Sequence, residues 1–364
     1  MSTETTPSTV QRTTFLQAVE RVLPAIGDSN IEGADSVVFS KGWAHSYRDD
    51  MSISAPIKDL ESLEAAVNAK KLAAIVKKLK ADVIEVTKTE TSLVLKSGTF
   101  TGELLLQPDT LSHAIASLNL DAVEWTTVPD GLGTAIALCR LENHRDKYPV
   151  VYFSENLVIA VTSFRWNYGV VVGDSMPTFA IHTETAKALL SLGDLVNYSV
   201  GDLWAHFHTE NGAIFSAKVQ DSAFPAKVIL AALNNVNGSD PVFKVDMPKD
   251  LGETVDRVAV FADADQTTGT PQLDVEVSGK YIKLGSKNST GSAKDKCALS
   301  EELPEGVEAK FMASVPYLHE AAKKVQTLSV VMVPAKGENG AVGVAPRLVF
   351  RGEAFTQIVS VSQK

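Results

Sequence analysis

The chain has 364 residues, of which 45% are hydrophobic and 21% are charged, and its formal net charge at pH 7 is −10. The length and composition are typical of a globular protein with a large core and two or three domains. The longest apolar runs, such as residues 157–161, are far shorter than the roughly 20 residues of a membrane-spanning helix, so we expect no contact with a membrane. An acidic chain can bind nucleic acid only where its cations gather on one surface, because binding requires neutralisation of phosphates.

The N-terminus and the cysteines bear on localisation. Residues 1–10 are rich in Ser and Thr and lack an apolar segment, which predicts a short disordered arm rather than a signal peptide. Cys139 and Cys297 are the only cysteines, and neither belongs to a Cys/His metal-binding pattern. We therefore expect a cytoplasmic protein with reduced thiols and no cofactor.

A helical pattern recurs in each third of the chain. Apolar residues at helical spacing begin near Thr13, near Asp130 and near Pro248. Each of these predicted helices is followed by segments that alternate between apolar and polar residues, as strands do. The predicted strands are residues 36–40 and 51–57, then 150–153 and 157–162, then 273–277 and 281–284.

A second helix and a strand pair follow in each third. The second helices are predicted over residues 63–79, 183–192 and 315–325, with Thr183 and Ser314 as N-caps and Pro316 in the first turn. The strand pairs surround Gly-containing turns in residues 92–106, 203–219 and 328–350. Residues 285–296 are predicted to form a flexible loop. The pattern indicates an α+β protein of three similar domains, with boundaries at 1–122, 123–240 and 241–364.

One predicted helix has two distinct faces. In AVNAKKLAAIVKKLK the apolar Leu72 and Val76 fall on one side, and four lysines fall on the other, with Lys80 close by. Such a face is often simply solvated. Cations beside the other predicted helices favour a second interpretation, in which one basic surface binds phosphates. These cations are Arg12, Arg21, Arg140, Lys187, Lys249, Arg257, Lys323 and Lys324.

Several segments, in order, resemble the bacterial DNA polymerase III beta subunit family, the DNA sliding clamps, in a divergent or phage-type form. The first third contributes FLQAVERVLPAI, MSISAPI and LVLKSGTFTGELLLQP. The second contributes YPVVYF, VIAVTSFRW and SAFPAKVIL, and the third contributes AKFMASVPYLHEAAKKV. The chain departs from the family's pattern at Ser163 and Phe164, at residues 226–229, and at the terminal SVSQK from Ser360.

The resemblance implies a function and a set of partners. It implies three clamp domains, each with two helices and antiparallel sheets, that form a homodimer ring around double-stranded DNA. The ring would act as a processivity factor in DNA replication, bound by a DNA polymerase and a clamp loader, and would not be an enzyme. The residues that would face DNA are Lys70, Lys71, Lys77, Lys78, Lys80, Arg21, Arg140, Lys187, Arg257, Lys323 and Lys324.

The resemblance also implies an apolar pocket for partner peptides. Carried over residue by residue, the pocket would contain Tyr152, Thr162, Arg165, Pro225, Leu230, Ile358 and Val361. Apolar groups with a few polar edges suit the capture of a short linear motif. The alternative is that Pro225, Leu230 and Ile358 are ordinary core residues.

Two other functions remain open from the sequence. His206, His208 and Glu210 alternate along a predicted strand, so they could share one face as metal ligands in a metal-dependent enzyme. A paired histidine without metal is the simpler interpretation, because no HExxH pattern and no further ligand cluster accompany them. Alternating strands are also typical of phage structural proteins.

Overall fold

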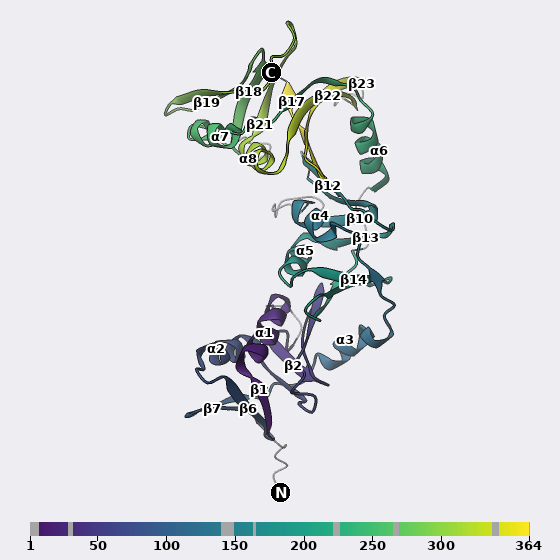
Figure 1. The fold of residues 1–364 in the computed structure, drawn as a ribbon, viewed down its shortest axis with the longest axis vertical. Coiled ribbons are helices and arrows are strands. Elements are labelled where there is room, and N and C mark those ends of the chain that lie inside the picture. The colour runs from purple at the N-terminus through teal and green to yellow at the C-terminus, as the bar shows by residue number, and fades with distance from the viewer. Residues whose placement is uncertain are drawn as a thin grey trace. The chain divides into compact units, whose positions relative to one another are not determined.

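The computed structural model describes residues 7–27, 32–139, 149–162, 165–220, 226–264, 269–336 and 342–363. The chain divides into two compact units (Figure 1). Unit 1 comprises Met1–Gly133 and Pro177–Asp221, and unit 2 comprises Thr134–Met176 and Ser222–Lys364. Among the described residues, no helix combines the length and the apolar character that crossing a bilayer would require.

Unit 1 contains two antiparallel sheets, in the strand orders β1-β6-β7-β8 and β5-β2-β3-β4-β16-β15-β14-β9. Helices α1 and α2 pack against each other, and α1 also packs on β3 and β4. The elements of the first third are β1 (Ser8–Gln11), α1 (Arg12–Val22), η1 (Leu23–Ala25), β2 (Ser36–Ser40), β3 (Trp43–Arg48), β4 (Met51–Pro56), β5 (Ala65–Asn68), α2 (Ala69–Lys78), β6 (Val83–Lys88), β7 (Ser92–Ser97) and β8 (Phe100–Leu105). The others are α3 (Ser112–Ser117), η2 (Leu120–Ala122), β9 (Thr126–Thr127), β13 (Met176–His182), α5 (Thr183–Leu190), β14 (Leu195–Val200), β15 (Trp204–Thr209) and β16 (Ile214–Lys218).

Unit 2 repeats this arrangement. One sheet has its unit 2 strands in the order β10-β11-β12-β24-β23-β22-β17, and the other has the order β20-β19-β18-β21-β25. The elements are α4 (Leu132–Cys139), β10 (Val150–Glu155), β11 (Leu157–Val161), β12 (Arg165–Val170), α6 (Ala226–Asn237), β17 (Pro241–Asp246), α7 (Leu251–Ala259), β18 (Gln272–Ser278), β19 (Tyr281–Lys287), β20 (Ser292–Ala298), β21 (Glu308–Ser314), α8 (Val315–Lys324), β22 (Thr327–Lys336), β23 (Val342–Arg351), β24 (Phe355–Ser360) and β25 (Ser362–Gln363).

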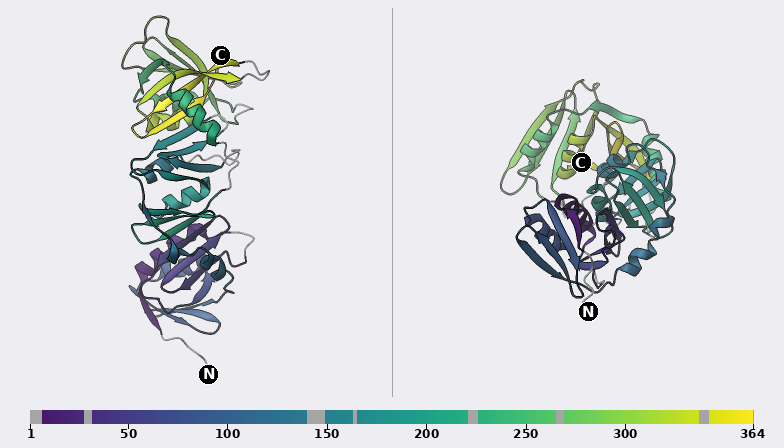
Figure 2. Two further views of the ribbon diagram at one scale, coloured as in Figure 1. Left: turned by 90° about the vertical axis from the view of Figure 1, so that its right-hand side faces the viewer. Right: turned by 60° about the horizontal axis from the view of Figure 1, so that its bottom comes forward.

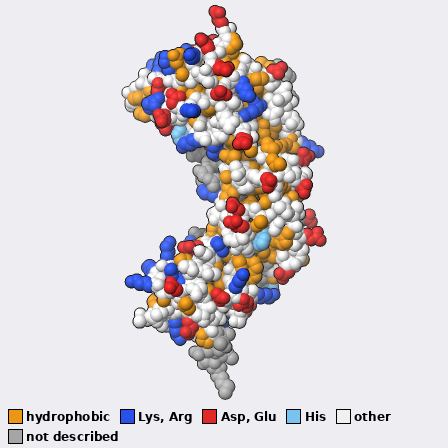
Figure 3. Space-filling view, viewed as in Figure 1, with side chains coloured by type: hydrophobic (Ala, Val, Ile, Leu, Met, Phe, Trp, Pro, Cys, Tyr) orange, Lys and Arg blue, Asp and Glu red, His pale blue; other side chains and the backbone are white. Residues whose placement is uncertain are grey.

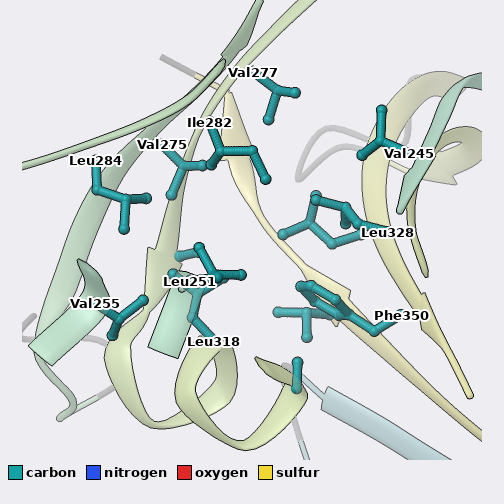
Figure 4. Close-up of a cluster of buried hydrophobic side chains, with 14 of the residues drawn as sticks. Val245, Leu251, Val255, Val275, Val277, Ile282, Leu284, Leu318, Leu328 and Phe350 are labelled. Atoms are coloured by element: carbon teal, nitrogen blue, oxygen red, sulfur yellow. The ribbon is translucent and has the colours of Figure 1, made fainter. Parts of the chain in front are cut away.

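Apolar periodicity explains how unit 2 forms its core. The buried faces of α7 and α8 contribute Leu251, Val255 and Leu318, which point toward strand residues such as Val275 and Leu328 (Figure 4). Helix residues at a spacing of three to four and strand residues at a spacing of two place all of these side chains on inward faces. The two helices and the strands of both sheets therefore share one hydrophobic core, as expected for an α+β protein.

Each large sheet joins strands from two different thirds of the chain. In unit 1, β4 pairs with β16 in the register Ile53 to Phe215. In unit 2, β12 pairs with β24 in the register Asn167 to Gln357. Figure 2 (left) shows the teal strands of the middle third beside the yellow C-terminal strands that they join. Gly169 on β12 permits the close approach of helix α4, because a Cβ there would lie 2.8 Å from Ala135 Cβ.

The α+β class and all six predicted helices are confirmed, but three predictions of local structure were wrong. The second helix of the first third begins at Ala69 rather than residue 63, because Ala65–Asn68 forms the edge strand β5 paired with β2. Residues 285–296 are not a loop, because β19 and β20 form a hairpin there. Ser8–Gln11, the last part of the predicted disordered arm and the residue after it, forms β1 and pairs with β6.

The helix caps differ in part from prediction. The N-cap of α5 is His182 rather than Thr183, and its side chain accepts a hydrogen bond from the Glu184 N–H at 3.3 Å. Ser314 is the N-cap of α8 and Pro316 lies in the first turn, as predicted, but the Ser314 side chain makes no capping hydrogen bond. Helices α3 and α6 were not predicted.

Candidate nucleic-acid interface and partner surface

Helix α2 presents a continuous cationic face. Lys70, Lys71, Lys77 and Lys78 are exposed, while Leu72 and Val76 are buried on the opposite side. The helix starts cleanly because the N-cap Asn68 accepts a hydrogen bond from the Lys71 N–H at 3.0 Å. Lys80 is also exposed, two residues beyond the helix. Figure 3 shows Lys and Arg side chains gathered where α2 lies.

The neighbouring helix α1 adds less charge. Arg21 in its last turn is half-buried, and Arg12 at its start is half-buried with no hydrogen-bond partner for Nε. Glu20 of α1 lies 3.9 Å from Lys77 Nζ, with both groups well exposed. An exposed pair at this distance stabilises the helix contact very little.

Lys187 on α5 borders a cavity of about 450 Å³ within unit 1. Arg48, Asp50 and His182 also line this cavity. Burial alone would raise the pKa of Asp50, but hydrogen bonds from Arg48 and Thr185 outweigh burial and lower it. The Asp50 carboxylate is already paired with Arg48 Nε at 2.6 Å. Lys187 is exposed on α5.

Arg257 of α7 and Lys324 of α8 are in contact with acids. Arg257 Nε lies 2.7 Å from Asp295 Oδ2 on β20, and its Nη1 lies 3.8 Å from Glu253. Lys324 Nζ lies 2.6 Å from Glu320 Oε1. Lys249 and Lys323 are exposed. Arg140 lies outside the described residues.

Arg165, the charged residue of the predicted partner pocket, is buried and already paired. Arg165, 6% exposed, forms an ion pair with Glu320 of α8, and its guanidinium carbon lies 4.3 Å from the Tyr317 ring centroid. Its backbone N–H donates to Thr162 Oγ1 at 3.0 Å. Arg165 therefore already has a carboxylate partner within unit 2.

The remaining pocket residues differ in exposure. Ile358 is 1% exposed and Tyr152 is 5% exposed, so both side chains belong to the packed interior of unit 2. Leu230 on α6 and Val361 after β24 are half-buried. Pro225, Ser163 and Phe164 lie outside the described residues.

His206, His208 and Glu210 do not form a common site. His206 is buried and its Nδ1 lies 2.8 Å from Ser216 Oγ, while burial lowers its pKa to about 4. The His208 ring packs 5.6 Å from the Trp125 ring, and Glu210 follows the end of β15. Within the described ranges, no group of three or more His, Cys, Asp or Glu side chains is placed to hold a metal ion.

Sequence reasoning missed Glu320 and Asp295, which lie within 2.7 Å of the proposed DNA-facing cations Lys324 and Arg257. Glu320 could have been found, because it stands four residues before Lys324 on one helix, the spacing of a helical ion pair. Asp295 could not, because it lies on a strand that was expected to be a loop. The two thiols are buried, and burial raises the pKa of Cys139 strongly and that of Cys297 to about 12, which keeps both protonated.

The fold was compared with known proteins. No family model and no curated protein sequence matches this chain. Among solved structures, the DNA polymerase III beta chain from Streptococcus pneumoniae matches with a TM-score of 0.79 at 13% identity, over 100% of both chains. The DNA polymerase sliding clamp from Bacillus subtilis matches with a TM-score of 0.76 at 16% identity, over 98% of this chain and 99% of that one. The beta subunit from Streptococcus pyogenes matches with a TM-score of 0.77 at 16% identity, over 99% and 100%. The chain therefore has, over its full length, the fold of the bacterial DNA sliding clamp.

Proposed function

We propose that this protein is a DNA sliding clamp, a ring-forming processivity factor without catalytic activity that encircles duplex DNA and tethers a replicative DNA polymerase. A clamp loader would place it on DNA. The observation that carries the proposal is the repeated way in which the thirds of the chain join. The first and second thirds join through β4 and β16, and the second and third join through β12 and β24.

The same rule leaves two equivalent edges unused within one chain. In the strand orders, β20 occupies the place of β4 and β12, and β8 occupies the place of β16 and β24. Edge strands with unpaired backbone groups are templates for pairing with another chain. Pairing of β8 with β20 of a second copy would therefore close a head-to-tail ring of two chains, with six domains over 1–122, 123–240 and 241–364 of each.

The repeats also specify which residues of β8 are equivalent to those of β16 and β24. A backbone N–H at the start of each first helix, or four residues before it, donates to a carbonyl at the beginning of the strand that follows the second helix or just before that strand. The residue three positions after that carbonyl pairs with a residue on the next strand, which in turn pairs with a residue on β8, β16 or β24. In the three repeats this last residue is Thr101, Ser216 and Ile358. In the first repeat the hydrogen bond is Arg12–Asp82 and the strand pairs are Glu85–Lys96 and Lys96–Thr101. In the second the hydrogen bond is Val128–Val196 and the pairs are Ser199–His206 and His206–Ser216. In the third the hydrogen bond is Met247–Gln326 and the pairs are Ser329–Val349 and Val349–Ile358.

The other edge of the proposed joint, β20, is aligned with β4 by a side-chain hydrogen bond that occurs in both the first and the third repeat. Ser46 Oγ donates to the Val22 carbonyl, and Ser286 Oγ donates to the Val258 carbonyl, which makes β3 and β19 equivalent. Ser46 pairs with Ile53, and Ser286 pairs with Ala293. Because Ser216 faces Ser52 in unit 1, the proposed register places Thr101 opposite Ser292 of the second copy, and Phe100 opposite Ala293.

Exposure of Phe100 supports this register. Phe100 is 38% exposed on β8, whereas Phe215, its equivalent at the internal joint, is fully buried. Burying an aromatic ring is among the larger favourable contributions to an interface. Phe100 would therefore be buried at the joint between two chains, as Phe215 is buried at the joint within one chain.

In the proposed ring, the helices α1, α2, α4, α5, α7 and α8 would face the duplex. Their cations would contact phosphates without reading bases, which gives sequence-independent binding and permits sliding. The partner site would lie on unit 2 around Leu230 and Val361, with Tyr152, Thr162, Arg165 and Ile358 beneath it. We propose that this site takes a short apolar segment of the polymerase.

Retention on DNA tests the proposed function. Protein loaded by a cognate loader should remain on nicked circular DNA through a salt wash and should slide off after the circle is cut. Equal retention on circular and linear DNA would contradict encirclement. Solution scattering should give the profile of a hollow ring for the free protein.

Disulfide trapping tests the register. Both native cysteines are buried, so Thr101→Cys combined with Ser292→Cys should give a closed, covalently linked dimer under mild oxidation. The matched control is Thr101→Cys with Lys296→Cys, which keeps both exposed strands but shifts the pair by four residues. Crosslinking of the control alone would contradict the proposed pairing.

A further inference from the structure

The six helices that would face DNA carry very different charge. Helix α2 contains Lys70, Lys71, Lys77 and Lys78 and no acid. Helix α7 contains Glu253 and Asp256 against the single cation Arg257. Helix α5 contains one acid and one lysine, and α8 contains two lysines and Glu320. The positive charge is therefore concentrated on α2.

Two of the cations on these helices, Arg257 of α7 and Lys324 of α8, already bind carboxylates of their own unit. The Arg257 guanidinium donates to Asp295 at 2.7 Å, and this hydrogen bond is the main cause that raises the pKa of Arg257. Lys324 donates to Glu320 at 2.6 Å, while the other oxygen of Glu320 binds Arg165. A phosphate that approaches either cation has to displace a carboxylate.

Three of the four lysines of α2, and Lys80 beyond it, have no such competitor. Lys70, Lys71, Lys78 and Lys80 make no ion pair with another described residue, and Lys77 is 3.9 Å from Glu20. All five side chains are exposed. A free ammonium keeps its counterions in solution until DNA displaces them, and this release drives binding to duplex DNA.

Competition between a carboxylate and a DNA phosphate reduces the free energy that a paired cation contributes to DNA binding. The phosphate gains an attraction but a nearby carboxylate is left unpaired, and its charge then repels the phosphate at similar distance. Exposed Glu253 and Asp256 add to this repulsion on α7. For Arg257 and Lys324 the gain from binding DNA is therefore smaller than for an unpaired lysine.

We propose that α2, together with Lys80, is the main phosphate-binding surface of this chain, and that Asp295 and Glu320 withhold Arg257 and Lys324 from DNA. The inference rests on the proposed function and assigns its DNA contact to one helix rather than to all six. A ring of two chains would hold the duplex at two such helices. The partner is the phosphate backbone of duplex DNA.

The salt dependence of duplex binding tests the assignment. One variant changes Lys70, Lys71, Lys77 and Lys78 to Gln, which keeps helix propensity while removing four charges. The matched variant changes Lys249, Arg257, Lys323 and Lys324 to Gln, which also removes four. Affinity for a short linear duplex is measured by fluorescence anisotropy over a series of NaCl concentrations.

The α2 variant should lose up to about 3.6 from the slope of log affinity against log salt, since each phosphate contact contributes about 0.9. The unit 2 variant should lose about half as much, because Arg257 and Lys324 are paired with acids whereas Lys249 and Lys323 make no ion pair with another described residue. Equal losses, or a larger loss in unit 2, would overturn the assignment. Circular dichroism and thermal unfolding verify that both variants fold.

Two further variants test whether Asp295 and Glu320 keep Arg257 and Lys324 from binding DNA. Asp295→Asn removes the charge but keeps the shape of the side chain, so it should free Arg257 and steepen the salt slope by about 0.9. Glu320→Gln should do the same for Lys324. Unchanged slopes in both folded variants would show that these acids withhold nothing.

Failure of the inference differs from failure of the proposed function. If the wild-type chain shows no salt-dependent binding to duplex and no retention on circular DNA, the sliding clamp proposal fails. If the wild-type chain binds and is retained but the two Gln variants behave alike, only the assignment to α2 fails.

Discussion

His45 on β3 and His206 on β15 make matching hydrogen bonds on either side of the joint between β4 and β16. His45 Nδ1 lies 2.8 Å from Ser54 Oγ, and His206 Nδ1 lies 2.8 Å from Ser216 Oγ. Both rings are buried, at 8% and 7% exposure. The joint that links two thirds of the chain is thus flanked by two neutral imidazoles.

These histidines predict a specific loss of stability in acid. Burial lowers the pKa of both groups from 6.5 to about 4. The unfolded chain therefore binds more protons than the folded chain between these values, so stability is complete above about pH 6.5 and falls as the pH drops toward 4. Each histidine should contribute a slope of up to about 1.4 kcal/mol per pH unit, measured by denaturant unfolding of unit 1.

The matched control replaces both histidines. His45→Gln with His206→Gln keeps an amide that can bond to serine but cannot titrate in this range. The difference in unfolding free energy between wild type and this variant should shrink as the pH falls from 6.5 to 4. A constant difference would show that the imidazoles do not titrate as stated.

The ion pair of Arg165 and Glu320 should hold β12 against α8. The side chains are 8% and 21% exposed, so removing the carboxylate leaves a largely buried guanidinium without its partner. Glu320→Gln should lower the stability of unit 2 by about 2 kcal/mol, measured as a shift in its calorimetric transition. Glu308→Gln, which removes an exposed pair with Lys310, should change stability by less than about 0.5 kcal/mol.

Charge reversal on α2 should weaken binding to duplex DNA without unfolding the protein. Changing Lys70, Lys71, Lys77 and Lys78 to Glu leaves the buried face of Leu72 and Val76 intact, so thermal unfolding should barely change. Affinity for a short linear duplex at low salt should fall at least tenfold, because repulsion replaces attraction. Wild-type affinity of the folded variant would remove α2 from the DNA surface.

Phe100 should contribute to the association of two chains. If it is buried as Phe215 is, Phe100→Ser should weaken dimerisation at least tenfold, which corresponds to about 1.4 kcal/mol. Sedimentation equilibrium measures this change. The control is Leu105→Ser at the end of the same strand, which should have a smaller effect because Leu105 lies beyond the residues aligned with the internal joints. A larger effect of the control would contradict the register.

The joint between β12 and β24 shows why some site predictions could not be made from sequence. Ile358 and Arg165 look like pocket residues in a linear alignment, because apolar and cationic side chains suit peptide capture. Whether such residues reach solvent depends on what packs over them. For Arg165 the neighbours are Tyr317 and Glu320 of α8, which lie more than 100 residues away from it along the chain.

The sequence by itself determined the α+β class, the recurrence of helix and strand pattern in each third, and the cationic face of α2. These features are local, because spacing of apolar residues fixes which face of a helix or strand is buried. Tertiary structure alone decided that β4 pairs with β16 and β12 with β24, that residues 285–296 form an edge hairpin, that Asp295 binds Arg257 of α7, and that Glu320 of α8 binds Arg165 of β12. Those outcomes depend on contacts between distant segments, whose energies local spacing does not encode.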